Sequence, residues 1–189
     1  INCILNLIMI KFNIASINQC TEVEGPYKRL CIWFQGCILH CRGCCNPDYQ
    51  PLVPKNLLTL EELVDIVSDA QKEFGIEGVT YSGGEPTLQQ GLPKLTEEIH
   101  KLGLGVISFT GRKCENVIDI LQGVDAVLDG EFIENKREAN RRILGSTNQR
   151  IICLTDRYRN CIEGWFKQSE HLMAEVNFGN IISINGDKV

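Results

Sequence analysis

The alternation of hydrophobic and polar positions along the chain predicts a series of short strands. Each strand is a run of apolar, often β-branched residues that ends at glycine, proline or a polar cluster. The predicted strands are Phe12–Ile17, Arg29–Gln35, Val79–Ser82, Leu104–Thr110, Val124–Leu128 and Arg150–Leu154, with a last one near Asn180–Ile184.

Helical periodicity separates several of these strands. Thr59 and Glu62 have the spacing of a capping box, and the apolar spacing that follows predicts an amphipathic helix over Leu60–Phe74. A second helix has Pro93 in its first turn and ends before Gly103. A short third helix is predicted over Glu115–Gln122.

Strands that alternate with helices indicate an α/β fold with a parallel sheet and crossover helices. A complete eight-fold barrel takes roughly 200 residues or more, and the chain has 189. We therefore expect one domain over residues 1–189, built as an incomplete (partial) β/α barrel with mostly parallel strands. Met9 is a candidate start, which would make residues 1–8 an upstream extension.

The net charge and the apolar runs of the chain argue against two classes of binding partner. The formal net charge is −5, whereas a nucleic-acid-binding face needs a local positive excess. The basic residues Lys136, Arg137, Arg141 and Arg142 alternate with glutamates, which predicts a solvated helix face. No run approaches the ~20 apolar residues of a membrane span. We therefore expect neither a nucleic acid nor a membrane as a partner.

Ten cysteines are the most unusual feature of the composition. Cys44 and Cys45 are adjacent, and Cys31 and Cys153 lie in predicted strands, where a thiol acts as a small hydrophobic group. This distribution does not suggest a disulfide framework, so we expect a reducing, cytoplasmic location. Cys114 is interpreted as an ordinary helix-start residue.

Cys37, Cys41 and Cys44 have the spacing C-x3-C-x2-C, directly after a predicted strand. Three thiolates so close in sequence are able to wrap one iron–sulfur cluster. A structural zinc site would need a fourth ligand, for which His40 is the nearest candidate, and a bacterial ferredoxin run has four cysteines at another spacing. Cys45 is too close to Cys44 to reach a separate iron. Three ligands leave one metal position open, as in catalytic sites.

This motif, followed by Ser82–Pro86 at the end of the next strand, resembles the radical S-adenosylmethionine (AdoMet) superfamily. The resemblance implies that Cys37, Cys41 and Cys44 hold a 4Fe–4S cluster whose open iron binds AdoMet. One electron then yields a 5′-deoxyadenosyl radical that abstracts hydrogen. It also implies AdoMet contacts at Gly83, Gly84 and Glu85, and at Thr110 and Gly111 of the next strand end.

Further segments are similar to the activating proteins of anaerobic ribonucleoside-triphosphate reductases. They are Gly25–Arg29, Phe34–Cys37, Cys44–Pro47, Phe109–Gly111, Asp125–Phe132 and Gly145–Arg150. Gly43 before the third cysteine also fits these activators, while Cys45 and Arg112 depart from their usual pattern. Asp129 and Asn148 match the signatures without an assigned role.

The resemblance implies an activase that abstracts hydrogen from a glycine of the reductase, with an external electron donor such as flavodoxin. The alternatives are another small radical AdoMet enzyme, namely the activase of a different glycyl-radical enzyme, a peptide-modifying enzyme or 7-carboxy-7-deazaguanine synthase. An iron–sulfur carrier or a zinc-binding interaction module is the remaining reading. Such a protein would have a fourth protein ligand and would not turn over AdoMet.

Overall fold

The structure, a computed structural model, describes residues 10–167, 174–178 and 182–186. Within them, the main sheet has seven strands in the order β3-β1-β2-β4-β5-β6-β7. Their bounds are Lys11–Thr21 (β1), Arg29–Phe34 (β2), Asn56–Thr59 (β3), Gly78–Gly83 (β4), Gly105–Thr110 (β5), Ala126–Asp129 (β6) and Arg150–Cys153 (β7). A separate hairpin pairs β8 (Ala174–Phe178) with β9 (Ile182–Gly186).

The centre of the main sheet is parallel, which confirms the predicted α/β class with a mostly parallel core. β2, β4, β5 and β6 pair parallel in that order. The flanking strands differ from the expected alternation, because β1 pairs antiparallel with β2 and β3, and β7 pairs antiparallel with β6. Neighbouring strands pair parallel only when a crossover connection, usually a helix, joins them. No helix lies between β1 and β2 or between β6 and β7, so these pairs are antiparallel.

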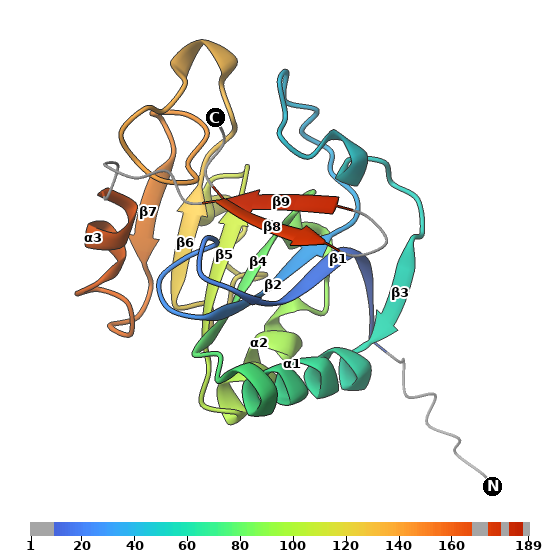
Figure 1. The fold of residues 1–189 in the computed structure, drawn as a ribbon. Coiled ribbons are helices and arrows are strands. Elements are labelled where there is room, and N and C mark those ends of the chain that lie inside the picture. Colours follow the sequence, from blue (N-terminus) through green and yellow to red (C-terminus); the bar gives the residue numbers. More distant parts are fainter. Residues whose placement is uncertain (1–9, 168–173, 179–181, 187–189) are drawn as a thin grey trace, which may run out of the picture.

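Two helices cover one face of this sheet. α1 (Leu60–Phe74) and α2 (Leu92–Lys101) share a hydrophobic core with Leu30, Ile32 and Phe34 of β2. Cys31 and Trp33 alternate with them along β2, so they point to the opposite face. There the hairpin β8–β9 crosses the sheet (Figure 1). The described part is completed by α3 (Ile162–Lys167) and four 3-10 turns at Pro47–Tyr49, Pro86–Leu88, Cys114–Asn116 and Glu134–Lys136.

Both long helices begin and end as predicted. Thr59 accepts a hydrogen bond from the Glu62 N–H at 3.2 Å, and the Glu62 carboxylate accepts one from the Thr59 N–H at 2.7 Å. Gly75 ends α1 in the left-handed conformation, with φ 66°. Pro93 lies in the first turn of α2. Of the described helices, none is long and apolar enough to cross a membrane.

Two predicted helices are wrong. Glu115–Gln122 forms only a 3-10 turn at Cys114–Asn116 and further turns, because β-branched and Asn/Asp residues weaken so short a segment. The basic stretch is likewise no helix beyond Glu134–Lys136. Arg142 is 6% exposed and stacks on the Trp165 ring, so the stretch is not a uniformly solvated face.

The C-terminal strand was predicted near Asn180–Ile184, and the structure places β9 at Ile182–Gly186. Asn180 itself lies outside the described residues, as do Met9 and residues 1–8. β8 was not predicted. The nine described cysteines form no disulfide with one another.

The capping box predicts a measurable contribution to stability. Thr59→Ala removes the side-chain oxygen that accepts from Glu62, so the free energy of unfolding should fall by about 1 kcal/mol. Chemical denaturation measures it. Thr59→Ser retains the oxygen and serves as the control, and equal stability of the two variants would contradict the assigned cap.

Candidate functional site

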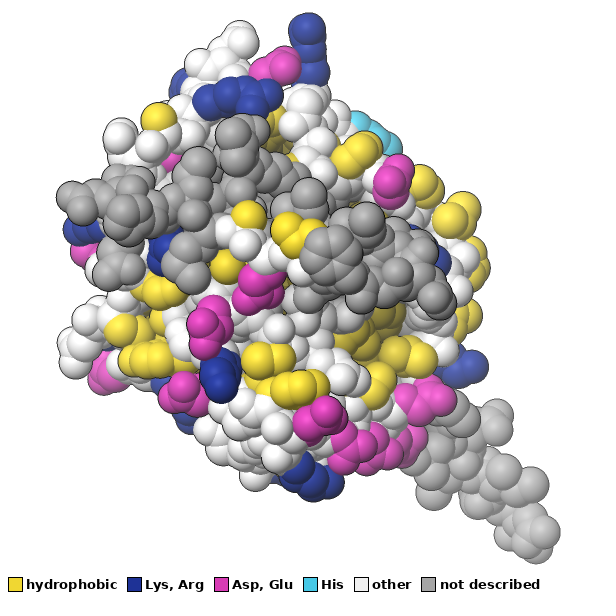
Figure 2. Space-filling model, in the orientation of Figure 1, with side chains coloured by type: hydrophobic (Ala, Val, Ile, Leu, Met, Phe, Trp, Pro, Cys, Tyr) yellow, Lys and Arg dark blue, Asp and Glu magenta, His cyan; other side chains and the backbone are white. Residues whose placement is uncertain are grey.

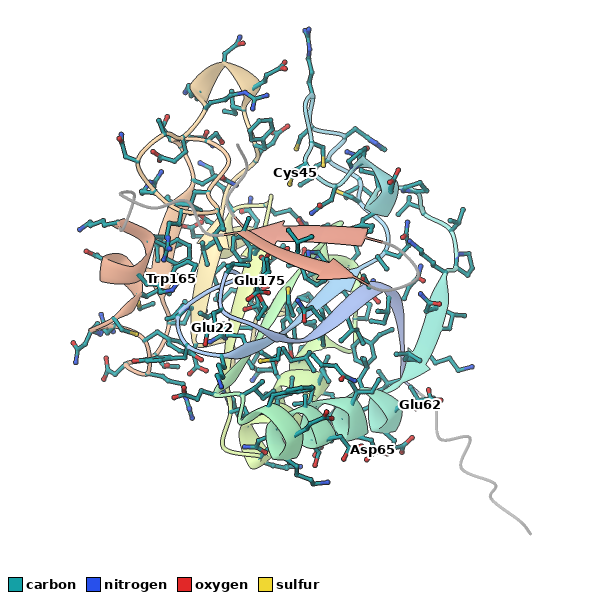
Figure 3. All side chains as sticks on the ribbon, viewed as in Figure 1. Glu22, Cys45, Glu62, Asp65, Trp165 and Glu175 are labelled. Carbon is teal, nitrogen blue, oxygen red and sulfur yellow. The ribbon has the colours of Figure 1, made fainter. Side chains whose placement is uncertain are left out.

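The cysteine loop begins where β2 ends. Parallel strands β2, β4 and β5 end at one edge of the sheet, which is where ligands bind in parallel α/β folds. Cys45 marks the loop above the hairpin β8–β9 in Figure 3. The predicted ligands therefore lie at the same edge as the predicted AdoMet strips at the ends of β4 and β5.

Each of the three motif cysteines follows a residue with positive φ. These residues are Gly36 (φ 102°), His40 (φ 52°) and Gly43 (φ 74°). A residue in this region turns the chain sharply, and for His40 the conformation is strained. The repeated turns bring Cys37, Cys41 and Cys44 close enough that charge on one raises the pKa of another.

Backbone N–H groups surround the sulfurs. Cys37 Sγ accepts hydrogen bonds from Leu39 and His40, and Cys41 Sγ accepts one from Phe132. The Asn46 N–H donates to Cys44 Sγ at 3.4 Å. Burial raises the pKa of the Cys37 and Cys41 thiols, and these donors oppose the shift. Such donors stabilise a metal-bound thiolate once the proton has left.

The predicted strip Gly83–Glu85 packs backbone against backbone on this loop. The Gly84 N–H donates to Phe34 O and the Glu85 N–H to Gly36 O, both at 2.8 Å. A Cβ on Gly84 would lie 2.3 Å from Gly36 O and 2.6 Å from Tyr49 O. Glycine is therefore required here by the cysteine loop itself.

The carboxylate of Glu85 is buried inside the protein. The residue is fully buried, and its oxygens accept from the Thr87 N–H and hydroxyl, the Thr110 hydroxyl and the Gly111 N–H. These bonds, 2.7–3.1 Å long, join the strip after β4 to the end of β5. Glu85 thus supports both strips from behind, and its contact with AdoMet stays a prediction.

A cavity of about 490 Å³ opens between these strips and the cysteine loop. This volume lies in the usual range for small-molecule sites. Gly83, Gly84, Thr110 and Gly111 line it, whereas Glu85 does not. The other lining residues near the loop include Trp33, Cys41, Gly43, Cys44, Cys45, Asn46, Ser82 and Phe132.

The connection between β6 and β7 forms the far wall of the cavity. Phe132 lies between two glycines, because a Cβ on Gly43 would be 3.3 Å from one side of its ring and a Cβ on Gly145 would be 2.7 Å from the other. The Arg137 guanidinium lies 5.9 Å from the ring centroid. Phe132 and Gly145 each belong to a segment that carries the resemblance, but the sequence did not predict that the Phe132 ring lies between Gly43 and Gly145.

Asp129 and Asn148 acquire structural roles. The buried Asp129 carboxylate accepts from the Cys114 N–H at 2.8 Å and pairs with Arg150. Asn148 donates to Glu131 O at 2.9 Å. Both residues therefore fix loops around the cavity. The prediction that Cys31 is a core residue is confirmed, since it is fully buried, and Cys153 is partly buried.

Two contributors were missed by sequence analysis. Gln35 is 3% exposed and its amide donates to Pro51 O at 2.8 Å, which closes the base of the cysteine loop. The hairpin β8–β9 reaches the cavity through Gly186, and Glu175 on β8 accepts from the Glu22 N–H at 2.8 Å (Figure 3). Gln35 had a signal in Phe34–Cys37, whereas the sequence predicted a strand near β9 but neither β8 nor the approach of the hairpin to the cavity.

The donor set fits an iron–sulfur cluster. Among the described residues, no three His, Cys, Asp or Glu side chains converge enough to hold a single metal ion. A zinc ion draws its thiolates to about 2.3 Å from one point, whereas a cubane distributes them over separate irons. Cys37, Cys41 and Cys44 have N–H donors, and Cys41 and Cys44 line the cavity, which fits the second arrangement.

Gly84→Ala is expected to destabilise the protein. The added methyl would press on two carbonyl oxygens of the cysteine loop, a kind of overpacking that costs about 1–3 kcal/mol. Denaturant unfolding measures the loss. Gly164→Ala is the matched control, because nothing lies within 4 Å of its Cβ position. A loss no greater than in the control would refute the close approach.

Glu85→Gln tests the buried carboxylate. The glutamine side chain has the same shape, but its NH2 group replaces an oxygen that accepts a hydrogen bond. A donor then faces a donor, and an unpaired buried polar group costs about 1–3 kcal/mol. The exposed Glu163→Gln in α3 should change stability by less than about 0.5 kcal/mol. If the two variants unfold at the same denaturant concentration, Glu85 does not join the two strips.

Comparison with known proteins agrees with this geometry. The family described as "4Fe-4S single cluster domain" matches residues 23–152. The anaerobic ribonucleoside-triphosphate reductase-activating protein of Enterobacteria phage T4 is 30% identical over 155 residues, covering 76% of this chain and 96% of that protein.

The pyruvate formate-lyase-activating enzyme of Staphylococcus aureus (strain USA300) is 31% identical over 157 residues. The match covers 76% of this chain but only 62% of that protein. Among solved structures, QueE from Escherichia coli matches with a TM-score of 0.46 and 20% identity over 53% of each chain, a similarity too slight to bear on function.

The family match spans the cysteine loop, both glycine-bearing strips and the far wall of the cavity. The chain therefore belongs to the 4Fe–4S single-cluster family of the radical AdoMet enzymes, whose cofactors are a 4Fe–4S cluster and AdoMet.

Proposed function

We propose that the protein is an activase that makes a glycyl radical on an anaerobic ribonucleoside-triphosphate reductase. The observation that carries the proposal is the cavity that Cys41 and Cys44 share with Gly83, Gly84, Thr110 and Gly111. It supports the proposal because the candidate cluster ligands and the candidate AdoMet contacts line the same cavity at one edge of the sheet.

Cys37, Cys41 and Cys44 are the ligands in this proposal. When bound, the cluster supplies the single electron that cleaves AdoMet to a 5′-deoxyadenosyl radical. The N–H groups around the three sulfurs stabilise the thiolate form that the ligands need. Cys45 neighbours Cys44 in sequence and lines the cavity without a ligand role.

Gly83, Gly84, Thr110 and Gly111 are the proposed AdoMet contacts. Their backbone is accessible from the cavity, and carbonyl oxygens there are acceptors for an ammonium group. Glu85 acts as a positioning residue behind them, since its oxygens are already engaged within the protein. The walls Trp33, Phe109 and Phe132 exclude water from a reactive radical.

Two relatives point to different protein substrates. The reductase is favoured because the matched region covers 96% of the phage T4 reductase activator. The lyase is the second candidate, because the S. aureus lyase activator has a similar identity of 31%, although only 62% of its length is covered. Either substrate would present a glycine to the cavity on a protein loop.

The ligand assignment gives a first test. Anaerobically reconstituted protein with dithionite should cleave AdoMet. The Cys41→Ala variant should not, because its cluster would lose one of three protein ligands. Liquid chromatography of 5′-deoxyadenosine measures turnover. Cys153→Ala, which removes a thiol from β7, is the control and should behave as the unmodified protein does.

The same preparation tests the substrate. Mixed with AdoMet, dithionite and the reductase of the same organism, it should generate a glycyl radical visible by electron paramagnetic resonance. A radical that forms on pyruvate formate-lyase and not on the reductase would replace the first candidate by the second. AdoMet that remains intact beside a fully loaded cluster would contradict both.

A further inference from the structure

The cavity wall contains an aromatic ring that the hydrophobic core does not use. Three aromatic side chains of the described residues line the cavity, namely Trp33, Phe109 and Phe132. Trp33 belongs to one buried cluster, and Phe109 packs against another. Phe132 is partly buried, yet it belongs to none of the hydrophobic clusters that the described residues form. Its ring is therefore available to a ligand in the cavity.

Hydrogen bonds fix the backbone of Phe132 beside the cysteine loop. Its own N–H donates to Cys41 Sγ. The carbonyl oxygen of the residue before it accepts from the Asn148 amide at 2.9 Å, and the N–H of the residue after it donates to Ser146 Oγ at 3.1 Å. The ring is thus held next to a proposed cluster ligand before any ligand binds, which lowers the entropy cost of binding.

Two glycines confine the Phe132 ring at its edges. A Cβ on Gly145 would lie 2.7 Å from Cδ2 and 3.2 Å from Cε2, and its next nearest atom is Gln149 Oε1 at 3.6 Å. The other ring atoms are no closer than this oxygen, so Gly145 meets the ring at its edge and not over a face. On the opposite edge, the Cβ position of Gly43 lies 3.3 Å from Cε1. A side chain at Gly145 would displace the ring.

One face of the ring lies toward a cation. The Arg137 guanidinium carbon is 5.9 Å from the ring centroid, within the roughly 6 Å of a cation–π contact. Arg137 belongs to the β6–β7 connection, and Figure 2 shows charged side chains gathered at this end of the molecule. Since both edges and this face are occupied, the other face is the surface that Phe132 contributes to the cavity wall. A flat aromatic group would pack well against it.

From these contacts we infer that Phe132 stacks on the adenine ring of AdoMet, an inference that rests on the AdoMet site proposed above. The amino-acid end of AdoMet carries charged groups that suit the open iron and the backbone of the glycine strips. Adenine is instead a flat aromatic ring that needs an apolar face. Because the Phe132 backbone is bonded to Cys41, its ring lies close to whatever the cluster binds. Phe132 is therefore a cofactor-binding residue contributed by the β6–β7 connection.

Equilibrium binding without turnover tests the inference. Protein reconstituted with an oxidised cluster is titrated anaerobically with AdoMet in the absence of reductant, and isothermal titration calorimetry gives the Kd. Phe132→Leu retains an apolar side chain and the N–H that donates to Cys41 but lacks the ring, so AdoMet should bind about tenfold more weakly. Phe132→Tyr retains the ring and should bind AdoMet as tightly as the unmodified protein does.

A second ligand and a second variant serve as controls. S-methylmethionine has the carboxylate, amine and sulfonium of AdoMet but no adenosine, so its Kd should be the same for Phe132→Leu and the unmodified protein. Phe74→Leu is the matched variant, because Phe74 is also partly buried but packs against the main core and does not line the cavity. Its Kd for AdoMet should equal that of the unmodified protein. Iron and sulfide analysis checks that every protein carries the same cluster.

Three results would overturn the stacking. An unchanged Kd for AdoMet in Phe132→Leu would show that the ring does not hold the adenine. An equal weakening of S-methylmethionine would make Phe132 a support of the cluster end, and an equal weakening in Phe74→Leu would indicate a general loss of structure. In all three cases the unmodified protein still binds AdoMet. Failure of the proposed function differs, because then AdoMet would not bind even the unmodified protein with its full cluster.

Discussion

The site depends on a close backbone contact between the cysteine loop and the strip that follows β4. Gly84 approaches Gly36 and Tyr49 so closely that a methyl group has no room, and two backbone hydrogen bonds extend the β2–β4 pairing past the end of the sheet. The register of the sheet thereby sets the register of the loop. Cys37, which follows Gly36, is fixed relative to Gly83 and Gly84 before any cofactor binds.

Buried polar side chains join the ends of the neighbouring strands by hydrogen bonds. Glu85 joins the end of β4 to the end of β5, and Asp129 joins the end of β6 to the Cys114 backbone and Arg150. Each buried carboxylate is satisfied by several donors, which is what burial of a charge requires. Glu85 and Asp129, which belong to the segments that carry the resemblance, therefore hold the backbone beside the cavity in place.

Much of this arrangement could be predicted from the sequence because it is encoded locally. The capping box at Thr59, the C-terminal Gly75 and the C-x3-C-x2-C spacing each depend on a few neighbouring residues. The antiparallel pairing of β1 was not predictable from alternation, since it follows from the absence of a crossover helix.

What the sequence did not predict depends on tertiary contacts. Phe132 meets Gly43 and Gly145 only because the β6–β7 connection folds back over the cysteine loop. Arg142 belongs to a stretch of alternating charge, yet Trp165 of α3 covers it. The sequence also did not predict that Glu85 is fully buried and that its oxygens accept hydrogen bonds from Thr110 and Gly111.

The account as a whole requires a cluster with three protein ligands and one iron open to AdoMet. Mössbauer spectroscopy of protein reconstituted with ⁵⁷Fe tests this directly. We predict four irons per chain, of which one changes its isomer shift when AdoMet is added and three do not. Four irons that stay unchanged, or zinc in place of iron, would contradict the account.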